Sequence, residues 1–298
     1  MATVEANGTH QRRAGPWSRI TDQSRARPVS TKWHRPHWSY SQLSQYLRCP
    51  LQYYFERILQ LKRPFITSKL VFGSVLHEVL AAYHRGIQLG SYLSIDKAER
   101  FFQLLWQLRE AEELIQYSGE TKEQLHDQAM HLIELYFDQP PPTDVVGVEQ
   151  ALVVPLKTSS GEFLEKPLVA IVDLLTRESG QLTVTEFKTS GRRYSENATD
   201  RELQATCYRH AVEERYDEPA SVQYKVLVRT QKPTLQALDI ASESLNSGRL
   251  GDLAQAADRA IAANVFYPVQ SVMNCSGCPF YKPCREWPIS GRSTASVT

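Results

Sequence analysis

The sequence lacks the features that would place it in a membrane or in a secretory pathway. No apolar run approaches the roughly 20 residues that a membrane-spanning helix needs. The N-terminus has no apolar segment of the kind found in signal peptides. We therefore expect a cytoplasmic protein with no membrane partner. The chain also has no internal repeat, and at 298 residues with 42% hydrophobic content it can bury a substantial core.

An excess of charge of one sign is also missing, since the formal net charge is only +1. The charge is unevenly distributed: residues 1–37 carry a net +5 and the remainder a net −4. A nearly neutral body is not a general binder of polyanions, so any nucleic-acid contact there should be confined to a groove. Residues 1–37, rich in Arg, Ser and Thr and poor in aliphatic side chains, are predicted to be a disordered basic tail.

Cysteine is scarce but grouped. Five cysteines without an export signal argue against a disulfide framework and favour a metal or redox role. Three of them form Cys275-x₂-Cys278-x₅-Cys284, and a fourth ligand would have to be Cys49 or Cys207. Four thiolates can hold an iron–sulfur cluster or a zinc ion. Zinc ribbons normally use two short cysteine knuckles, whereas this chain has one.

The periodicity of apolar residues changes along the chain. Helical spacing dominates up to residue 137, beginning at a Ser39 N-cap, restarting at Pro50 and ending firmly at residues 140–142. Alternating patterns then predict strands over 145–156, 168–176, 182–187 and 222–229, with helices over 200–216 and 250–263. This order predicts an α/β sheet with a helical cap, within one domain over 38–298. Residues 90–140 would be a helical insertion in that domain.

A carboxylate–lysine pattern lies on two of the expected strands. Asp173 ends the apolar run 168–172, and Glu186 and Lys188 lie on the next strand, pointing to the same side. An antiparallel neighbour would bring Asp173 beside Glu186, and paired carboxylates favour Mg²⁺ or Mn²⁺. A nearby lysine can orient or help deprotonate water for attack on a phosphodiester. A solvated strand face with an ordinary Glu–Lys pair would give the same pattern.

The order of five motifs resembles the PD-(D/E)XK nuclease superfamily, which implies the restriction-endonuclease-like α/β fold, a mixed central sheet flanked by helices. Within it, the RecB-type exonuclease domains and the CRISPR-associated iron–sulfur nucleases are the most similar. The resemblance covers about residues 38–287. The motifs are Ser39-Tyr-Ser-Gln-Leu with Cys49-Pro50, Gly73-x₃-His77, Asp173, Glu186-x-Lys188, and Gln204-x₃-Tyr208 followed by the terminal cysteines.

The resemblance implies roles for individual residues. Asp173 and Glu186 would be catalytic metal ligands, joined by His77 and the main-chain carbonyl of Phe187, and Lys188 would be the catalytic lysine. The small Gly73 would let its helix approach the sheet. Ala170 stands where the family usually has glycine, a mild departure. Glu149 is a candidate further acidic neighbour of the metal.

The resemblance also implies nucleic-acid contacts and a second cofactor. Gln204 and Tyr208 share a helix face and would contact DNA, with Arg192, Arg193 and Arg201 nearby. Cys49 would join Cys275, Cys278 and Cys284 around a [4Fe–4S] cluster, with zinc as the alternative.

Together these features predict a metal-dependent DNA nuclease, an exonuclease on single strands or frayed ends, in DNA repair, recombination or CRISPR adaptation. The alternative is a catalytically weak DNA-binding subunit of a repair or adaptation complex. The pattern of a helicase P-loop, Gly-x₄-Gly-Lys-Ser/Thr, is absent, so ATP-driven unwinding would require a partner. A helicase or a CRISPR integrase is therefore an expected partner.

Overall fold

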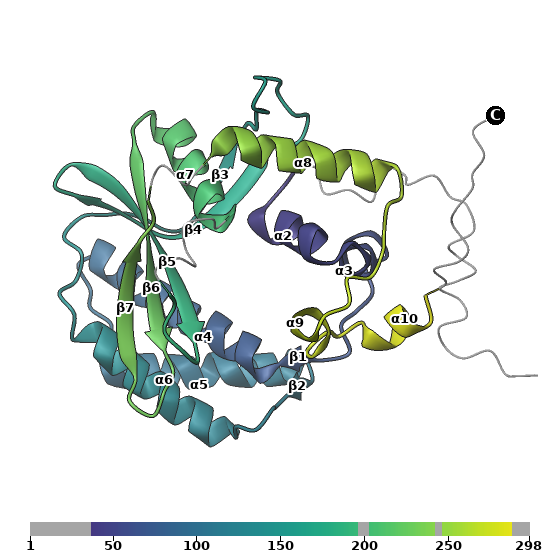
Figure 1. Cartoon of the computed structure of the whole chain (residues 1–298). Coiled ribbons are helices and arrows are strands. Elements are labelled where there is room, and N and C mark those ends of the chain that lie inside the picture. Colours follow the sequence, from purple (N-terminus) through teal and green to yellow (C-terminus); the bar gives the residue numbers. More distant parts are fainter. Residues whose placement is uncertain (1–36, 196–202, 242–245, 288–298) are drawn as a thin grey trace, which may run out of the picture.

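The computed structural model describes residues 37–195, 203–241 and 246–287. The expected disordered tail over 1–37 therefore lies outside the described residues, except for His37. Figure 1 shows a mixed sheet with helices on both of its faces. None of the helices in the described ranges is long and apolar enough to cross a membrane.

The sheet has five strands in the order β3-β4-β5-β6-β7. Neighbours pair antiparallel except β5 and β6, which are parallel and connected through helix α7, Leu203–Tyr216. A two-residue turn joins β4 to β5, with Ser179 and Gly180 both at positive φ, as a tight hairpin of this kind requires. The strands are β3 Val145–Val154, β4 Leu168–Glu178, β5 Gln181–Ser190, β6 Ala220–Val228 and β7 Thr234–Asp239.

Each face of the sheet has its own core. The first core packs helices of the two chain ends and α7 against side chains such as Val184 and Val226. The second core packs α4, α5 and α6 against Leu174, Phe187 and Leu227. The expected mixed α/β fold is confirmed. The helices are α2 Tyr40–Arg48, α3 Pro50–Tyr53, α4 Ser68–Gln88, α5 Ile95–Glu112, α6 Lys122–Phe137 and α8 Ser247–Ala262.

Local sequence signals set several helix boundaries. The Ser39 hydroxyl accepts a hydrogen bond from the Gln42 amide and caps α2, and Pro50 occupies the first turn of α3. The segment Tyr54–Ile58 continues α3 as a short π-helix, η2. In the segment 90–140, α5 and α6 contribute buried side chains to the second core beside those of α4.

Five short elements were not predicted. Strand β7 completes the sheet edge, and β1 Ile66–Thr67 pairs in parallel with β2 Ile115–Gln116. Helices α9 Val272–Cys275 and α10 Tyr281–Arg285 carry three of the cysteines or flank them. Elements of two to five residues are too short to produce a periodic pattern. The partial alternation of apolar residues in 234–239 could have predicted β7.

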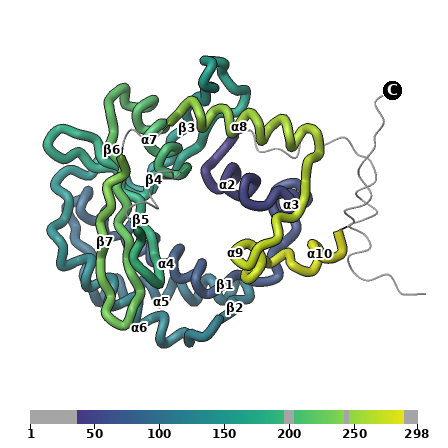
Figure 2. Tube along the Cα trace, viewed as in Figure 1, coloured from purple at the N-terminus to yellow at the C-terminus, as the bar shows by residue number. Residues whose placement is uncertain are grey.

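Segments from the two ends of the described chain lie side by side, as Figure 2 shows for α2 and α3 beside the C-terminal segment. The rings of Tyr54 and Phe55 pack on Trp287 with centroids 5.2 and 5.4 Å apart. The Asn274 amide donates to the Arg48 carbonyl at 3.2 Å. Apolar contact and hydrogen bonding therefore already hold these ends together.

Candidate active site

Asp173 lies in the middle of β4. Its carboxylate takes the place of a backbone hydrogen-bond acceptor for β5. Regular pairing with β5 runs from Glu178↔Gln181 up to Leu174↔Thr185. One residue further on, Asp173 Oδ2 accepts a hydrogen bond from the Phe187 amide at 2.9 Å. The strand geometry thus places the Asp173 carboxylate beside residues 186–188, as the sequence pattern predicted.

Glu186, Lys188 and Gln204 form one buried network beside Asp173. Lys188 Nζ donates to Glu186 Oε1 at 2.8 Å and to the Gln204 side-chain oxygen. The Gln204 amide nitrogen lies 2.8 Å from both Glu186 Oε1 and the Tyr208 hydroxyl. Glu186 is only 3% exposed, and its second oxygen, Oε2, has no hydrogen-bond partner in the described structure.

Gln204 and Tyr208 are themselves buried, each 6% exposed. Their observed contacts orient Glu186 and Lys188 from helix α7. A contact between these two residues and DNA stays a prediction. Sequence reasoning missed that the Gln204 side chain bridges the carboxylate and the lysine, because a bond to residue 186 depends on how α7 packs over the sheet.

His77 approaches Asp173 from the opposite layer, on α4. Its Nδ1 lies 3.4 Å from Asp173 Oδ2, and its ring packs edge-on against Phe187. Gly73, one helical turn earlier, faces β5. A Cβ there would lie 3.3 Å from the Thr189 hydroxyl, so the expected close approach of this helix to the sheet is observed.

Burial and like charge set the ionisation of the two central carboxyl groups. Burial, followed by repulsion from Asp173, raises the pKa of Glu186 to about 7, although Lys188 opposes the shift. Burial also opposes ionisation of Asp173, but hydrogen bonds from His77 and the Phe187 amide outweigh it and lower its pKa. Two carboxylates in contact, one with an unpartnered oxygen, are an arrangement that a divalent cation would stabilise.

Glu149 on β3 also lies beside these carboxyl groups, and its backbone is strained. Its φ is +48°, a left-handed conformation that is unusual for a residue with a side chain. It lies between the pairs Val148↔Leu174 and Gln150↔Val172, opposite Asp173. Burial and the charge of Asp173 raise the pKa of Glu149. One ligand atom from each of His77, Glu149 and Asp173 lies within 4.8 Å of the other two.

The predicted arginines are only partly observed. Arg192 and Arg193 are exposed just beyond the C-terminal end of β5, which carries Glu186 and Lys188. Arg201 lies outside the described residues. The structure therefore brings His77, Asp173, Glu186, Lys188, Gln204 and Tyr208 together and leaves the role of the arginines as a prediction.

The sequence of residues 37–285 matches the family described as the PD-(D/E)XK nuclease superfamily. The chain belongs to this superfamily. Such nucleases typically act on nucleic acids with divalent metal ions, which agrees with the candidate metal-binding group of His77, Glu149 and Asp173. No curated protein is similar enough to this superfamily member to be matched.

Solved structures resemble this PD-(D/E)XK chain in fold. A candidate exonuclease from Eubacterium rectale superposes with a TM-score of 0.53 at 10% identity, over 92% of this chain and 96% of that one. At that identity the likeness concerns the fold alone. SSO0001 aligns over 80% of this chain and 92% of that one at 11% identity, but its TM-score of 0.34 is too low to support an argument.

Four of the five cysteines of this PD-(D/E)XK chain form one group, and Cys207 is separate from them. Cys49, Cys278 and Cys284 are half-buried against the first core. Burial, followed by electrostatic interaction with other cysteines that include Cys49 and Cys275, raises the pKa of Cys278 and of Cys284. Cys207 is fully buried, and burial raises the pKa of its thiol to about 12. Cys207 therefore has the environment of a core residue.

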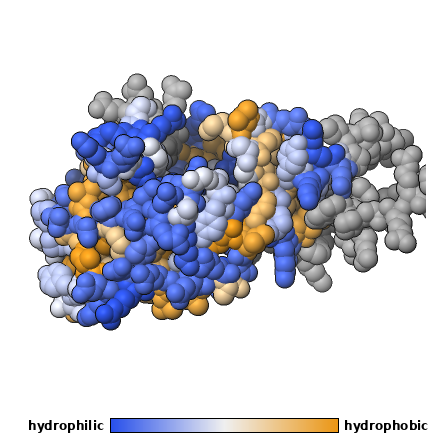
Figure 3. All heavy atoms as spheres, turned by 90° about the horizontal axis from the view of Figure 1, so that it is seen from below, coloured by the Kyte–Doolittle hydropathy of each residue, from blue (hydrophilic) through white to orange (hydrophobic). Residues whose placement is uncertain are grey.

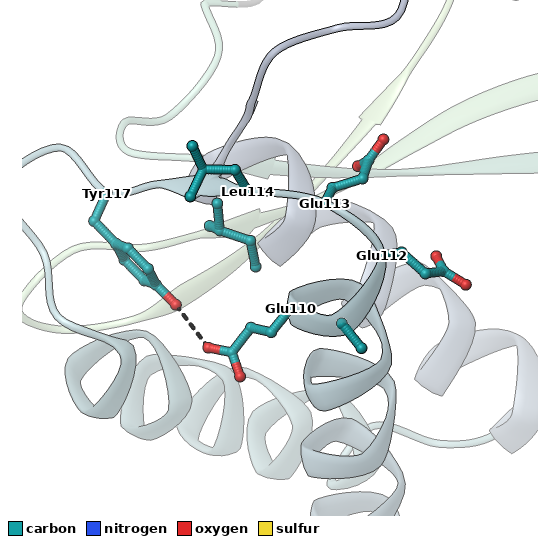
Figure 4. A pocket seen from close by; sticks show the side chains of 7 residues that line it. Glu110, Glu112, Glu113, Leu114 and Tyr117 are labelled. Carbon is teal, nitrogen blue, oxygen red and sulfur yellow. Dashed lines mark hydrogen bonds between the residues drawn. The ribbon is translucent and has the colours of Figure 1, made fainter.

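A separate surface pocket lies where α5 leads into β2, lined by residues 110–115 and Tyr117. In Figure 4 the Tyr117 hydroxyl donates to Glu110, which also pairs with Lys122 at 2.6 Å. The underside in Figure 3, where α5 and α6 lie, is mostly hydrophilic with scattered apolar patches. Because the Glu110 carboxylate is already paired, this pocket lacks the unpartnered buried oxygen that distinguishes the site at Asp173.

Proposed function

We propose that this PD-(D/E)XK nuclease hydrolyses phosphodiester bonds in DNA with Mg²⁺ or Mn²⁺, as an exonuclease on single strands or frayed ends. The observation that carries the proposal is the buried contact between Asp173 and Glu186, with Glu186 Oε2 unpartnered and Lys188 hydrogen-bonded to the same carboxylate. Buried polar atoms without a partner are uncommon, and this one belongs to the carboxylate that lies against Asp173.

The proposal assigns a task to each group in the network. Asp173, Glu186, His77 and the main-chain carbonyl of Phe187 would hold the metal, which supplies charge stabilisation to the phosphate when bound. Lys188 would orient the attacking water and help remove its proton, and the 3′-oxygen would leave. Gln204 holds the Lys188 ammonium against Glu186, so the lysine is positioned before substrate arrives.

The nearly neutral body supports a confined rather than a broad DNA contact. The chain outside residues 1–37 carries a net charge of −4, so affinity for duplex DNA through its phosphates alone should be modest. Single strands or frayed ends offer unstacked bases that aromatic side chains can bind in addition. Exposed Arg192 and Arg193 near the site would supply the local positive charge.

We further propose that Cys49, Cys275, Cys278 and Cys284 hold a [4Fe–4S] cluster. Their thiols lie near enough to interact electrostatically. A compact cysteine triplet completed by one distant cysteine is the pattern of the RecB-type and CRISPR-associated subtype, and this resemblance supports an iron–sulfur cluster over zinc.

End-labelled oligonucleotides test the reaction and its polarity together. We expect Mn²⁺-dependent shortening of single-stranded DNA, slower digestion of blunt duplex, and no cleavage in EDTA. Labels at the 5′ and 3′ ends distinguish the two directions of digestion, and a circular single strand distinguishes exonuclease from endonuclease. Protein with intact metal and cluster that leaves all these substrates uncut would refute the nuclease proposal and favour the DNA-binding alternative.

A further inference from the structure

Helices cover only part of the sheet face that carries Asp173. Among the described residues, the second core beneath α4, α5 and α6 takes Val148 from β3 and Leu174 from β4, and no residue of either strand nearer to the β3–β4 connection. The alternate residues there, such as Leu152 and Ala170, are buried in the first core on the other side of the sheet. This part of β3 and β4 is therefore buried on one face and uncovered on the other.

The uncovered face is apolar and continuous. Along 151–158 every odd-numbered residue is exposed and every even-numbered residue is buried. Val153, 63% exposed, pairs with Val169 on β4, and Ile171, two residues further along β4, is 51% exposed. Paired residues on neighbouring strands, and residues two apart on one strand, share a face. Two residues beyond Ile171 the same face reaches Asp173 at the candidate active site.

An aromatic ring and a lysine lie at the far end of this face. Lys157 and Phe163 oppose each other in an antiparallel bridge, with Lys157 Nζ 4.7 Å from the centroid of the Phe163 ring. Phe163 is 62% exposed, so this pair faces solvent. Lys157 lies eight residues beyond Glu149, which is opposite Asp173, so at the rise of a strand about 26 Å separates the pair from the site.

The β3–β4 connection is held from behind by α8, which lies beside it in Figure 1. The Ser159 amide donates to Asp252 on α8 at 3.0 Å, and the Glu162 carboxylate accepts a hydrogen bond from the same helix. A Cβ at Gly251 would lie 1.9 Å from the Lys157 carbonyl oxygen, so this close contact requires glycine. The exposed side of the connection is thus preformed, and a ligand would bind it with little loss of conformational entropy.

We propose that this face binds the part of a single DNA strand that extends from the active site, with Phe163 stacking on a base and Lys157 contacting a phosphate. The inference rests on the proposed nuclease function and adds a binding site for its substrate. Exposed apolar patches of this kind mark interaction surfaces. Several apolar side chains with a single lysine suit unstacked bases better than the phosphates of a duplex. The face consists of Ala151, Val153, Lys157, Phe163, Val169 and Ile171.

The length of the face sets how many nucleotides it holds. At the rise of a stacked strand, about 3.4 Å per nucleotide, the distance of about 26 Å corresponds to about eight nucleotides. A dinucleotide bound at Asp173 would therefore not reach Phe163. In Phe163→Ala, KM should rise for a long single strand, whereas kcat and the cleavage of a dinucleotide should stay at wild-type values.

DNA binding in EDTA tests the face without reliance on cleavage. The probe is a fluorescent single strand of about 20 nucleotides, followed by anisotropy, and Phe163→Ala should bind it at least about 5-fold more weakly, the effect of losing one base–aromatic stack. Phe163→Trp keeps a ring and should bind like wild type. Lys157→Ala should reduce the slope of log K against log salt by about 0.7, as expected for one phosphate contact on a single strand.

A charge placed on the face separates it from the rest of the surface. Val153→Glu, at an exposed position, should weaken binding of the same strand by at least about 5-fold. Leu104→Glu places the same charge on α5 at a residue that is 51% exposed, and it should bind like wild type. Circular dichroism should be the same for all variants.

Wild-type affinity in both Phe163→Ala and Val153→Glu would overturn the proposal. A wild-type dimer that Val153→Glu converts to a monomer in analytical ultracentrifugation, with DNA affinity unchanged, would assign the face to a second copy of the chain instead. Weakened binding in both variants, with a wild type that binds the strand but cuts no DNA, would refute the nuclease function and leave this inference standing.

Discussion

At the scale of single residues, the central feature is one buried glutamate between a lysine and an aspartate. The sequence pattern placed Glu186 and Lys188 on one side of a strand and Asp173 beside them, and the structure agrees. The Gln204 bridge and the left-handed Glu149 could not be predicted. The bridge depends on tertiary packing, and a positive φ leaves no trace in a Glu flanked by ordinary strand residues.

Replacement of Glu186 should change how the metal-free protein responds to pH. The folded pKa of Glu186, about 7, lies above its ordinary value of 4.5. Its contribution to stability is therefore fully present below pH 4.5 and is lost as the pH rises through 7. The loss is on the order of 3 kcal/mol. In EDTA, Glu186→Gln should flatten this decline and be more stable than wild type at pH 8.

Urea unfolding at several pH values between 4.5 and 8.5 measures this effect. Glu134→Gln, which removes an exposed carboxylate on α6, is the matched control and should keep the wild-type pH dependence. Parallel curves for wild type and Glu186→Gln would show that Glu186 ionises normally in the folded protein, contrary to our account of the site.

At the scale of elements, the site depends on two helices that meet the sheet from opposite layers. Helix α4 brings His77 from the second core, and α7 brings Gln204 from the first. Long periodic segments such as these were predictable, and so was the Glu178–Gln181 turn. The pairing of β1 with β2 was not, since two residues on each side carry no pattern.

The spacing between α4 and β5 should control metal binding. In Gly73→Ala the new Cβ would lie 3.3 Å from the Thr189 hydroxyl and push α4, with His77, away from Asp173. Alanine also favours a helix by about 1 kcal/mol, so Tm should change little. Mn²⁺ affinity should fall by about 10-fold, which isothermal titration calorimetry would measure.

A double variant separates spacing from other effects of the alanine. Thr189→Ala removes the oxygen that the new Cβ approaches, so Gly73→Ala with Thr189→Ala should recover most of the lost affinity. Strictly additive losses in the two single variants would argue that helix spacing is not the cause.

At the scale of the whole molecule, segments near the two ends of the described residues pack against each other. The aromatic contacts of Tyr54 and Phe55 with Trp287 and the Asn274–Arg48 hydrogen bond join the two segments that carry four of the cysteines. The resemblance implies that Cys49 joins the terminal triplet, and electrostatic interaction with Cys49, Cys278 and Cys275 adds to the burial that raises the pKa of Cys284. That these cysteines hold an inorganic group, and which one, belongs to the proposal, because spacing in sequence does not determine it.

Replacing one proposed cluster ligand should weaken the packing between these two segments and leave the hydrogen bonds of the active site unchanged. Anaerobically purified wild type should be brown, with iron and sulfide in equal amounts. Cys49→Ser should lose the colour and unfold at a lower temperature. Cys207→Ala is the matched control, since this buried thiol lies outside the group, and it should keep the cluster. A colourless wild type containing zinc would contradict the cluster.

The most direct test of the central claim is the cleavage of end-labelled single-stranded DNA by wild type and Lys188→Ala in Mn²⁺. Lys188 contacts Glu186 and Gln204, so Lys188→Ala should lower the rate of DNA cleavage by at least about 100-fold. Its circular dichroism, Mn²⁺ binding and cluster content should stay near wild type. Lys232→Ala, an exposed lysine in the β6–β7 turn, should cut like wild type. Equal activity, or equal inactivity, of wild type and Lys188→Ala with metal and cluster intact would contradict the account.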